Sequence, residues 1–325
     1  MTRKLHLAAA QLGAAHLAHT REAMVARLRE LLRQAHSRGV RFVVFPELAL
    51  TTFFPRYWFD DAAEVEARFF ERSMPSPVTA PLFEDARRWG IGFYLGYAEL
   101  TPEGRHFNTA ILVSPQGEIV GKYRKVHLPG HAEHKPGAAF QHLEKKYFEV
   151  GDLGFNTWRI DDSAADSAGG RGAGSAIVGM LICNDRRWPE AFRALTLQGA
   201  ELVTLGFNTP TENLHYPEPP GLRVHHHLVM AQAMAFMNAT WLVETAKCGF
   251  EDGSRMFGHS VIVAPSGEIV AKTVSEDDEL ISFDADLDLA QDLKRTMFNY
   301  AAHRRPEHYR ILIDRVGAEV TPKNG

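Results

Sequence analysis

The sequence predicts an α/β protein made of two similar halves. Short apolar runs that suit buried strands alternate along the chain with segments whose apolar residues recur at helical spacing. Two stretches also return later in the chain in closely similar form, which indicates an internal repeat. Apolar residues make up 45% of the 325 residues, so the chain can bury a sizeable core.

The expected elements follow one another in a regular order. Strands are expected at residues 5–11, 40–45, 91–98, 110–113 and 176–182. Helices are expected at residues 20–37, 81–89 and 189–198. The first helix stops at Gly39, and the other two begin with proline, whose missing N–H needs no partner at a helix start. Strands that alternate with helices are typical of the α/β class.

The internal repeat consists of a hairpin and a strand. ILVSPQGEIVGK at 111–122 returns as VIVAPSGEIVAK at 261–272, each an apolar strand, a Pro-x-Gly turn and a second apolar strand. GVRFVVF at 39–45 returns as GAELVTL at 199–205. We infer two similar halves packed sheet against sheet as one domain; the alternative is a coincidence of common hairpin chemistry.

Composition excludes several classes of partner. Lysine and arginine total 36 against 40 acidic residues, so the formal charge is −4, without the basic excess of nucleic-acid or anionic-lipid binders. No stretch of about 18 uncharged apolar residues could span a bilayer, and the first apolar run is too short for a secretion signal. Two cysteines are too few for a disulfide framework. We expect a cytoplasmic protein with neither a nucleic-acid nor a membrane partner.

Two segments are expected to be loops. Residues 161–175 are rich in Asp, Ser, Ala and Gly and lack large apolar side chains, so they bury little surface. Residues 215–221 contain three prolines. Strong strand patterns flank the first segment closely, so we expect it to be an exposed connection within a domain.

Cys183 is the candidate nucleophile. It follows the apolar strand at 176–182, and in α/β sheets ligands bind at the carboxyl ends of the strands. Two following arginines and a nearby helix start would favour the thiolate over the thiol. The alternative is an inert buried cysteine, which is the role expected for Cys248.

A cysteine nucleophile needs a general base and a group that stabilises the oxyanion. Glu47 ends the buried strand pattern of residues 40–45 and is the best candidate base. Lys125 closes the first hairpin, where a lysine is unusual unless it has a charged partner, and is the best candidate electrophile. Taken alone, each of these residues could be a solvated charge at a strand end.

Taken together, the three positions resemble the nitrilase superfamily of carbon–nitrogen hydrolases, which uses Glu, Lys and Cys in this order. The matching stretches are FPE at 45–47, YRKVHLP at 123–129 and ICND at 182–185. The resemblance covers nearly the whole chain. It implies a four-layer αββα sandwich, a homo-oligomer (dimer or tetramer), and catalysis with no metal or organic cofactor.

The resemblance also implies a domain organisation. Residues 1–325 would form a single carbon–nitrogen hydrolase domain, with its core at about 4–290. Residues 291–325 would form a C-terminal extension that packs at the subunit interface.

Within the superfamily the chain looks most like the N-carbamoyl-D-amino-acid amidohydrolases. The stretches that carry this likeness are FPELALTTFFPR at 45–56, KYRKVHLPGH at 122–131, QHLEKKYF at 141–148, CNDRRWPE at 183–190, NTPT at 208–211 and the tail at 298–309. The likeness implies that Glu144 is a second catalytic carboxylate that supports Lys125 and the substrate. It further implies supporting or substrate-binding roles for Asn184, His127, His142 and His226.

Arg186 and Arg187 are the candidate groups that bind a substrate carboxylate beside Cys183. Guanidinium binds carboxylate bidentately, which lysine cannot do. Because a helix start disfavours cations, two adjacent arginines there indicate a nearby anion; the alternative is a surface pair. Asn208 and Thr209 follow the strand of the second half that parallels the Glu47 strand, so they would face the same site or form an ordinary turn.

A metal site is not expected. His225, His226 and His227 are consecutive, so they cannot all face one point in a helix or strand. The sequence also lacks a His-Glu-x-x-His pattern and paired cysteines.

Three departures from the family pattern limit the prediction of the substrate. The loop at 161–175 is long, the segment 131–140 reads differently, and Glu244 stands where a small residue is expected. A buried acid near a carboxylate site would repel the substrate unless Lys247 or an arginine neutralises it.

The sequence therefore predicts hydrolysis of N-carbamoyl-D-amino acids to the D-amino acid, ammonia and carbon dioxide through a covalent thioester-type intermediate. The expected partner is a small molecule that carries a carboxylate. One alternative is another superfamily amidase or a β-ureido acid hydrolase with an anionic substrate. Another is a non-catalytic protein on the same fold, which the intact Glu47, Lys125 and Cys183 argue against.

Overall fold

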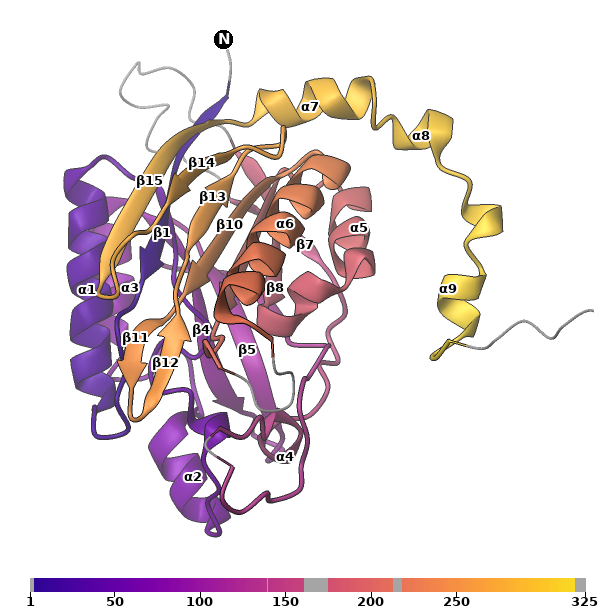
Figure 1. The fold of residues 1–325 in the computed structure, drawn as a ribbon. Helices are drawn as coiled ribbons and strands as arrows, with labels where there is room; N and C mark the ends of the chain where they lie inside the picture. Colours follow the sequence, from indigo (N-terminus) through magenta and orange to yellow (C-terminus); the bar gives the residue numbers. More distant parts are fainter. Residues whose placement is uncertain (1–2, 139, 161–174, 213–217, 319–325) are drawn as a thin grey trace, which may run out of the picture.

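Two β-sheets lie against each other, and helices cover the outer face of each (Figure 1). The computed structural model describes residues 3–138, 140–160, 175–212 and 218–318. Both predicted loops fall partly or wholly outside this part of the chain, at residues 161–174 and 213–217. The predicted four-layer αββα sandwich is confirmed.

The bounds of the elements follow the sequence pattern closely. The strands are β1 (Lys4–Gln11), β2 (Phe42–Val44), β3 (Phe70–Glu71), β4 (Gly92–Leu100), β5 (His106–Val113), β6 (Ile119–Arg124), β7 (Thr157–Ile160), β8 (Ala176–Ile182), β9 (Leu202–Phe207), β10 (Trp241–Ala246), β11 (Cys248–Glu251), β12 (Ser254–Phe257), β13 (Val261–Val263), β14 (Ile269–Lys272) and β15 (Glu279–Asp286). The α-helices are α1 (Arg21–Ser37), α2 (Ala62–Phe69), α3 (Ala80–Trp89), α4 (Glu144–Tyr147), α5 (Pro189–Leu197), α6 (Pro220–Asn238), α7 (Asp288–Arg295), α8 (Tyr300–His303) and α9 (Ile311–Asp314). Short 3₁₀ turns are η1 (Phe54–Arg56), η3 (Cys183–Arg187) and η4 (Pro306–His308).

The two sheets have the same strand path, which confirms the two similar halves. The first sheet has the order β15-β1-β2-β4-β5-β6, and the second has the order β14-β13-β10-β9-β8-β7. In each half three parallel strands (β1-β2-β4 and β8-β9-β10) are followed by an antiparallel hairpin (β5-β6 and β13-β14). Both hairpins turn at a glycine with positive φ, Gly117 at 75° and Gly267 at 85°, which is why the repeat preserves that residue type.

Two buried clusters hold the layers together. One joins α1 and α3 to the outer face of the first sheet. The other joins the inner face of the first sheet to the second sheet and, beyond it, to α5 and α6. The carboxyl ends of the parallel strands of both sheets therefore meet at the same end of the sandwich (Figure 1).

Helix α6 was not predicted, and part of the expected loop at 215–221 belongs to it. Its first turn contains Pro220 and Gly221, where a proline at a helix start is acceptable. Its sequence, PGLRVHHHLVMAQAMAFMN, carries apolar residues on several sides, so the helical period is weak.

The C-terminal extension leaves the body of the protein (Figure 1). Its early part still packs on the second half, since the rings of Phe298 and Phe236 lie 5.2 Å apart and the Arg193 guanidinium lies 4.5 Å from the ring of Tyr300. Beyond Tyr300 nearly every described residue is exposed. Among the described helices, none combines the length and apolar character needed to cross a membrane.

Candidate active site

Glu47 lies at the carboxyl end of β2, where its main chain is wedged between the two sheets. A Cβ on Gly96 of β4 would lie 2.8 Å from the Glu47 Cα, and one on Gly206 of β9 would lie 2.4 Å from the Glu47 nitrogen. Only glycine leaves room for so close an approach. The side chain of Glu47 is fully buried.

Four hydrogen bonds orient the Glu47 carboxylate. Oε1 accepts from Asn108 Nδ2 at 2.8 Å and from Lys125 Nζ at 2.8 Å. Oε2 accepts from the main-chain N–H of Asn208 at 3.0 Å and from its Nδ2 at 3.1 Å. Because both carboxylate oxygens accept hydrogen bonds from fixed donors, the carboxylate is held in one orientation.

Lys125 lies between two buried carboxylates, which confirms the expectation that it has a charged partner. It directly follows β6, and its Nζ donates to Glu47 Oε1 at 2.8 Å and to Glu144 Oε2 at 2.6 Å. Burial alone would lower the pKa of Lys125, but the charges of Cys183, Glu144 and Glu47 outweigh burial and raise it above its ordinary value. Burial raises the pKa of Glu144, with the Glu47 charge adding to this and the Lys125 charge opposing it.

Cys183 ends β8 and begins η3 in a sharp turn. Its φ of 48° lies in the left-handed region, which is uncommon for a residue other than glycine and is typical of functional sites. Its sulfur lies 3.6 Å from the carbonyl oxygen of Asn208. One side-chain ligand atom from each of Cys183, Glu47 and Glu144 lies within 4.8 Å of the others. The structure thus brings Glu47, Lys125, Glu144 and Cys183 into one buried cluster.

At Cys183, burial outweighs the positive charges that were expected to favour the thiolate. Burial raises the pKa of the Cys183 thiol to about 11, and the Glu47 charge adds to this, while the Lys125 and Arg186 charges only partly oppose it. The element that begins at Cys183 is a 3₁₀ turn of five residues, and α5 starts only at Pro189, so little helix dipole reaches the sulfur. A neutral thiol needs a base, and Glu47 is within reach of it.

The two adjacent arginines lie in different surroundings. Arg186 is buried, and its guanidinium donates to the Cys183 carbonyl at 3.4 Å and to Thr209 Oγ1 at 2.9 Å. Its Cζ also lies 4.2 Å from the centre of the Phe207 ring, which is a favourable cation–π distance. Arg187 is exposed, and its Nη1 donates to Asn184 Oδ1 at 3.1 Å.

Asn184 and His127 belong to a network around buried Asp185. Asp185 Oδ1 accepts from the His127 main-chain N–H at 3.0 Å and lies 2.7 Å from His127 Nδ1. Asn184 Nδ2 donates to the His127 carbonyl at 3.0 Å. The His127 ring stacks on Trp188, with ring centres 4.8 Å apart. This network fixes the turn after Cys183 against the segment after Lys125.

The other matched histidines lie apart from one another. The half-buried ring of His142 lies 4.8 Å from the ring of Phe140. His226 is exposed, and its Nδ1 pairs with Glu218 at 3.2 Å, so it does not point inward as expected. His227 is the buried member of the His run. Consecutive residues of a helix point in different directions. Because the apolar residues of α6 follow the helical period only weakly, the sequence did not indicate which of the three histidines faces the sheet.

Glu244 has a partner other than the two considered from sequence. Its Oε2 lies 3.2 Å from Nδ1 of His227, and both side chains are about 1% exposed. Lys247 instead donates to main-chain carbonyls, at 2.8 Å in the case of Leu48. Within the described part of the chain, neither Lys247 nor an arginine forms an ion pair with Glu244.

The cluster of Glu47, Glu144 and Cys183 has the donor types that could hold a metal ion. However, the ammonium of Lys125 already binds both carboxylates and supplies the positive charge between them. These side chains therefore suit acid–base and nucleophilic chemistry without a further cation.

Sequence reasoning missed Asn108, although it donates to the candidate base. Asn108 is buried in β5, a strand that is otherwise mostly apolar. A polar residue in a buried strand was the available signal, because buried amides need partners.

Comparisons with known proteins agree with this geometry. The sequence model of the carbon–nitrogen hydrolase family matches residues 6–295, which is most of the chain. The chain belongs to the carbon–nitrogen hydrolase family. Among relatives, N-carbamoylputrescine amidase of Arabidopsis thaliana is 30% identical over 302 residues, which cover 89% of each chain. A nitrilase of Pyrococcus abyssi is 29% identical over 286 residues, covering 86% of this chain and 90% of the other.

Solved structures of carbon–nitrogen hydrolases share the fold. The enzyme from Helicobacter pylori G27 superposes with a TM-score of 0.77 at 24% identity and covers 96% of this chain and 99% of its own. An amidase from Nesterenkonia sp. superposes with a TM-score of 0.66 at 23% identity, covering 95% and 96%. The relatives and solved structures that the chain resembles thus include amidases as well as a nitrilase.

Proposed function

We propose that the protein hydrolyses the carbamoyl C–N bond of N-carbamoyl-D-amino acids. Arg186 carries this proposal: the residue is 2% exposed, its guanidinium donates to the Cys183 carbonyl, and it has no carboxylate partner among the described residues. Its Nε also lacks a hydrogen-bond partner within that part of the chain. A buried guanidinium is costly without an anion, and the carboxylate of the substrate would supply one.

In this reaction Cys183 attacks the carbamoyl carbon while Glu47 accepts the thiol proton. The bond from Cys183 Sγ to carbon forms as the carbonyl π electrons move to oxygen. The Lys125 ammonium and the main-chain N–H of Asn184 stabilise that oxyanion. Since the thiol has a pKa of about 11, Glu47 must act during the attack rather than before it.

Collapse of the tetrahedral intermediate then releases the first nitrogen product. Glu47 returns its proton to the leaving nitrogen, and an acyl-thioester remains on Cys183. Water activated by Glu47 hydrolyses the thioester, so that the amino acid, ammonia and carbon dioxide are the final products. Glu144 Oε1 has no hydrogen-bond partner among the described residues and is available to a substrate N–H.

The alternative is another amidase of the family, and one relative is named for N-carbamoylputrescine. That substrate carries an ammonium group, which would need an unpaired acid. Glu218 is paired with Arg223, and buried Glu244 lies 3.2 Å from His227 Nδ1, whereas the guanidinium of Arg186 lies directly beside Cys183. The charges beside Cys183 therefore favour an anionic substrate, whether an N-carbamoyl amino acid or a β-ureido acid.

A substrate panel with ammonia detection tests the proposal. N-carbamoyl-D-amino acids, their L forms, β-ureido acids, N-carbamoylputrescine and neutral amides are compared by kcat/KM on the purified enzyme. We expect the N-carbamoyl-D-amino acids to be turned over fastest. Faster turnover of N-carbamoylputrescine or of a neutral amide would refute the anionic substrate, and faster turnover of L forms would refute the stereochemical assignment.

A single substitution tests carboxylate binding directly. Arg186→Lys keeps the charge but loses the planar fork, so we expect KM for carboxylate substrates to rise about tenfold while neutral amides change little. Arg193→Lys, on the neighbouring helix, is the matched control. Equal losses for both kinds of substrate would contradict a role in binding carboxylate.

We also propose that the enzyme is a homo-oligomer of the cytoplasm, where its free thiols stay reduced. Support comes from the extension beyond Tyr300, which leaves apolar side chains exposed, namely Ile311, Leu312, Ile313 and Val316. Light scattering of the full chain and of a chain ending at residue 303 would measure the difference. An unchanged mass would contradict a role of the extension in assembly.

A further inference from the structure

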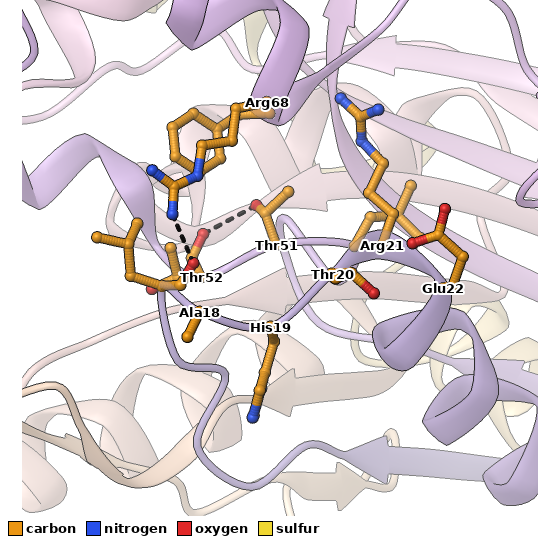
Figure 2. Close-up of a pocket in the computed structure, with 11 residues that line it drawn as sticks. Ala18, His19, Thr20, Arg21, Glu22, Thr51, Thr52 and Arg68 are labelled. Atoms are coloured by element: carbon orange, nitrogen blue, oxygen red, sulfur yellow. Dashed lines mark hydrogen bonds between the residues drawn. The ribbon is translucent and has the colours of Figure 1, made fainter.

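The segment that follows Glu47 is irregular, and one main-chain hydrogen bond, from the Ala49 N–H to the Gly96 carbonyl at 2.8 Å, ties it to β4. Residues 48–53 form neither helix nor strand, and Leu48 has a φ of 46°, a strained conformation for a branched side chain. On one side, Leu50, Thr51 and Thr52 line a surface hollow of about 320 Å³ (Figure 2). Besides the bond to β4, the segment is held by side chains of the second half.

Lys247 makes the first of these contacts. It follows β10 in the second half, and its side chain is fully buried. Its Nζ donates to the carbonyl oxygen of Leu48 at 2.8 Å and also to that of Thr51. The residue next to the candidate base is thus bound by a buried cation.

Glu251, at the end of β11, makes the complementary contact. Its Oε1 accepts from Thr52 Oγ1 at 2.8 Å and from the main-chain N–H of Phe53 at 3.1 Å. Its Oε2 accepts from the N–H of Ala15 at 3.1 Å, which joins the segment to the loop after β1. Lys247 therefore binds the carbonyls of the segment, and Glu251 binds its donors.

We propose that Lys247 and Glu251 are positioning residues that hold the 48–53 segment and thereby place the Glu47 carboxylate beside Cys183. Opposite charges from the second half thus position the base of the first half. The proposal rests on the proposed role of Glu47 as the base.

The charge state of Lys247 fits this role. Burial lowers the pKa of Lys247 to about 8, while the charges of Glu251 and Glu47 oppose the change. At neutral pH the side chain is therefore still mostly an ammonium, and its bonds to the two carbonyls are charge-assisted. A buried charge is costly unless its partners are well placed, so its retention beside the base indicates a function beyond packing.

The test is Lys247→Met, which keeps the length of the side chain and removes the charge. We expect kcat to fall about 100-fold with little change in KM, because displacing a catalytic group by about 1 Å costs about that much. Alkylation of Cys183 by iodoacetamide at pH 7, followed by peptide mass spectrometry, should slow in parallel because the base is displaced. This readout needs no knowledge of the natural substrate.

A double-mutant cycle separates positioning from a general loss of structure. In the Glu47→Gln background, Lys247→Met should cause no further slowing of Cys183 alkylation, because its effect passes through Glu47. Additive effects would overturn the proposal. If Glu47→Gln alone leaves alkylation unchanged, the role of Glu47 as the base is refuted instead, so the two failures are distinguishable.

Two further variants keep the proposal falsifiable if Lys247→Met folds poorly. Thr52→Val removes one hydrogen bond to Glu251 and should lower kcat a few-fold.

Lys294→Met is the matched control, because burial also lowers the pKa of Lys294 to about 8, and its Nζ also donates to a main-chain carbonyl, that of Ala200. Ala200 precedes β9, at the opposite end of the strand from the site. We expect Lys294→Met to leave kcat unchanged; a similar loss in both lysine variants, or no loss in Thr52→Val and Lys247→Met, would overturn the proposal.

Discussion

The two halves of the molecule share one strand path but bring different chemistry to one site. Strands β2 and β9 are equivalent in the two sheets, and the residues that follow them, Glu47 and Asn208, hydrogen bond to each other. The first half contributes an acid and the second an amide that donates to it. The repeated scaffold brings the strand ends together, whereas the side chains just beyond them decide the chemistry.

The two hairpins differ in the same way. In the first half β6 continues past Lys122 to Arg124, so that the next residue, Lys125, enters the buried cluster. In the second half β14 ends at Lys272, which is exposed. The first hairpin is thus two residues longer at this point, and the residue that follows it places a cation among the buried carboxylates.

The largest effect is expected from Cys183→Ala. Loss of the nucleophile should lower kcat by at least about 10⁴-fold, since no other group in the cluster can form the covalent intermediate. Ammonia release measures activity, and circular dichroism checks that the fold is intact. Turnover close to that of the unchanged enzyme would mean that the second half does not supply the nucleophile.

The hairpin comparison predicts a large contrast between two lysines. Lys125→Met should lower kcat about 10³-fold, because it removes the cation that faces both carboxylates and the oxyanion. Lys272→Met, in the second hairpin, should stay within about twofold of the unchanged enzyme. Comparable losses at the two positions would show that the hairpins do not differ in function.

Asn208→Ala should have an intermediate effect. Its Nδ2 is one of four donors to the Glu47 carboxylate, while its main-chain N–H would remain. We expect kcat to fall about tenfold, as for loss of one orienting hydrogen bond, with KM nearly unchanged. A change confined to KM would instead place Asn208 in substrate binding.

The last prediction concerns stability at alkaline pH rather than activity. The folded protein keeps the Cys183 proton up to about pH 11, whereas an unfolded chain loses it near pH 9. Unfolding therefore releases this proton between pH 9 and 11, so the stabilisation is present below pH 9 and is lost as pH rises through that window, by roughly 3 kcal/mol. Cys183→Ser lacks this contribution, and urea unfolding should show a smaller decline for it; parallel declines would contradict the raised pKa.

The positions of residues close to strand ends were predictable from sequence, because the apolar pattern of a strand and the direction of the chain are local properties. The apolar run of β8 places Cys183 at a carboxyl end, and the repeat pairs the two hairpins before any contact is known. Partners that come from distant strands were not predictable. Asn108 and Glu251 reach the base or its loop across 61 and 199 residues of sequence, and no local pattern reports such a contact.

By itself, then, the sequence determined the alternation of strands and helices, the twofold repeat and the identity of Glu47, Lys125, Glu144 and Cys183 as candidates. The tertiary structure alone decided that burial raises the pKa of the Cys183 thiol, that His227 rather than His226 faces inward, and that Lys247 and Glu251 bind the segment after Glu47. The physical reason is that the spacing of apolar residues follows from the local geometry of strands and helices. A pKa shift, the buried side of a helix and the partner of a charged side chain depend instead on residues that are distant in the chain.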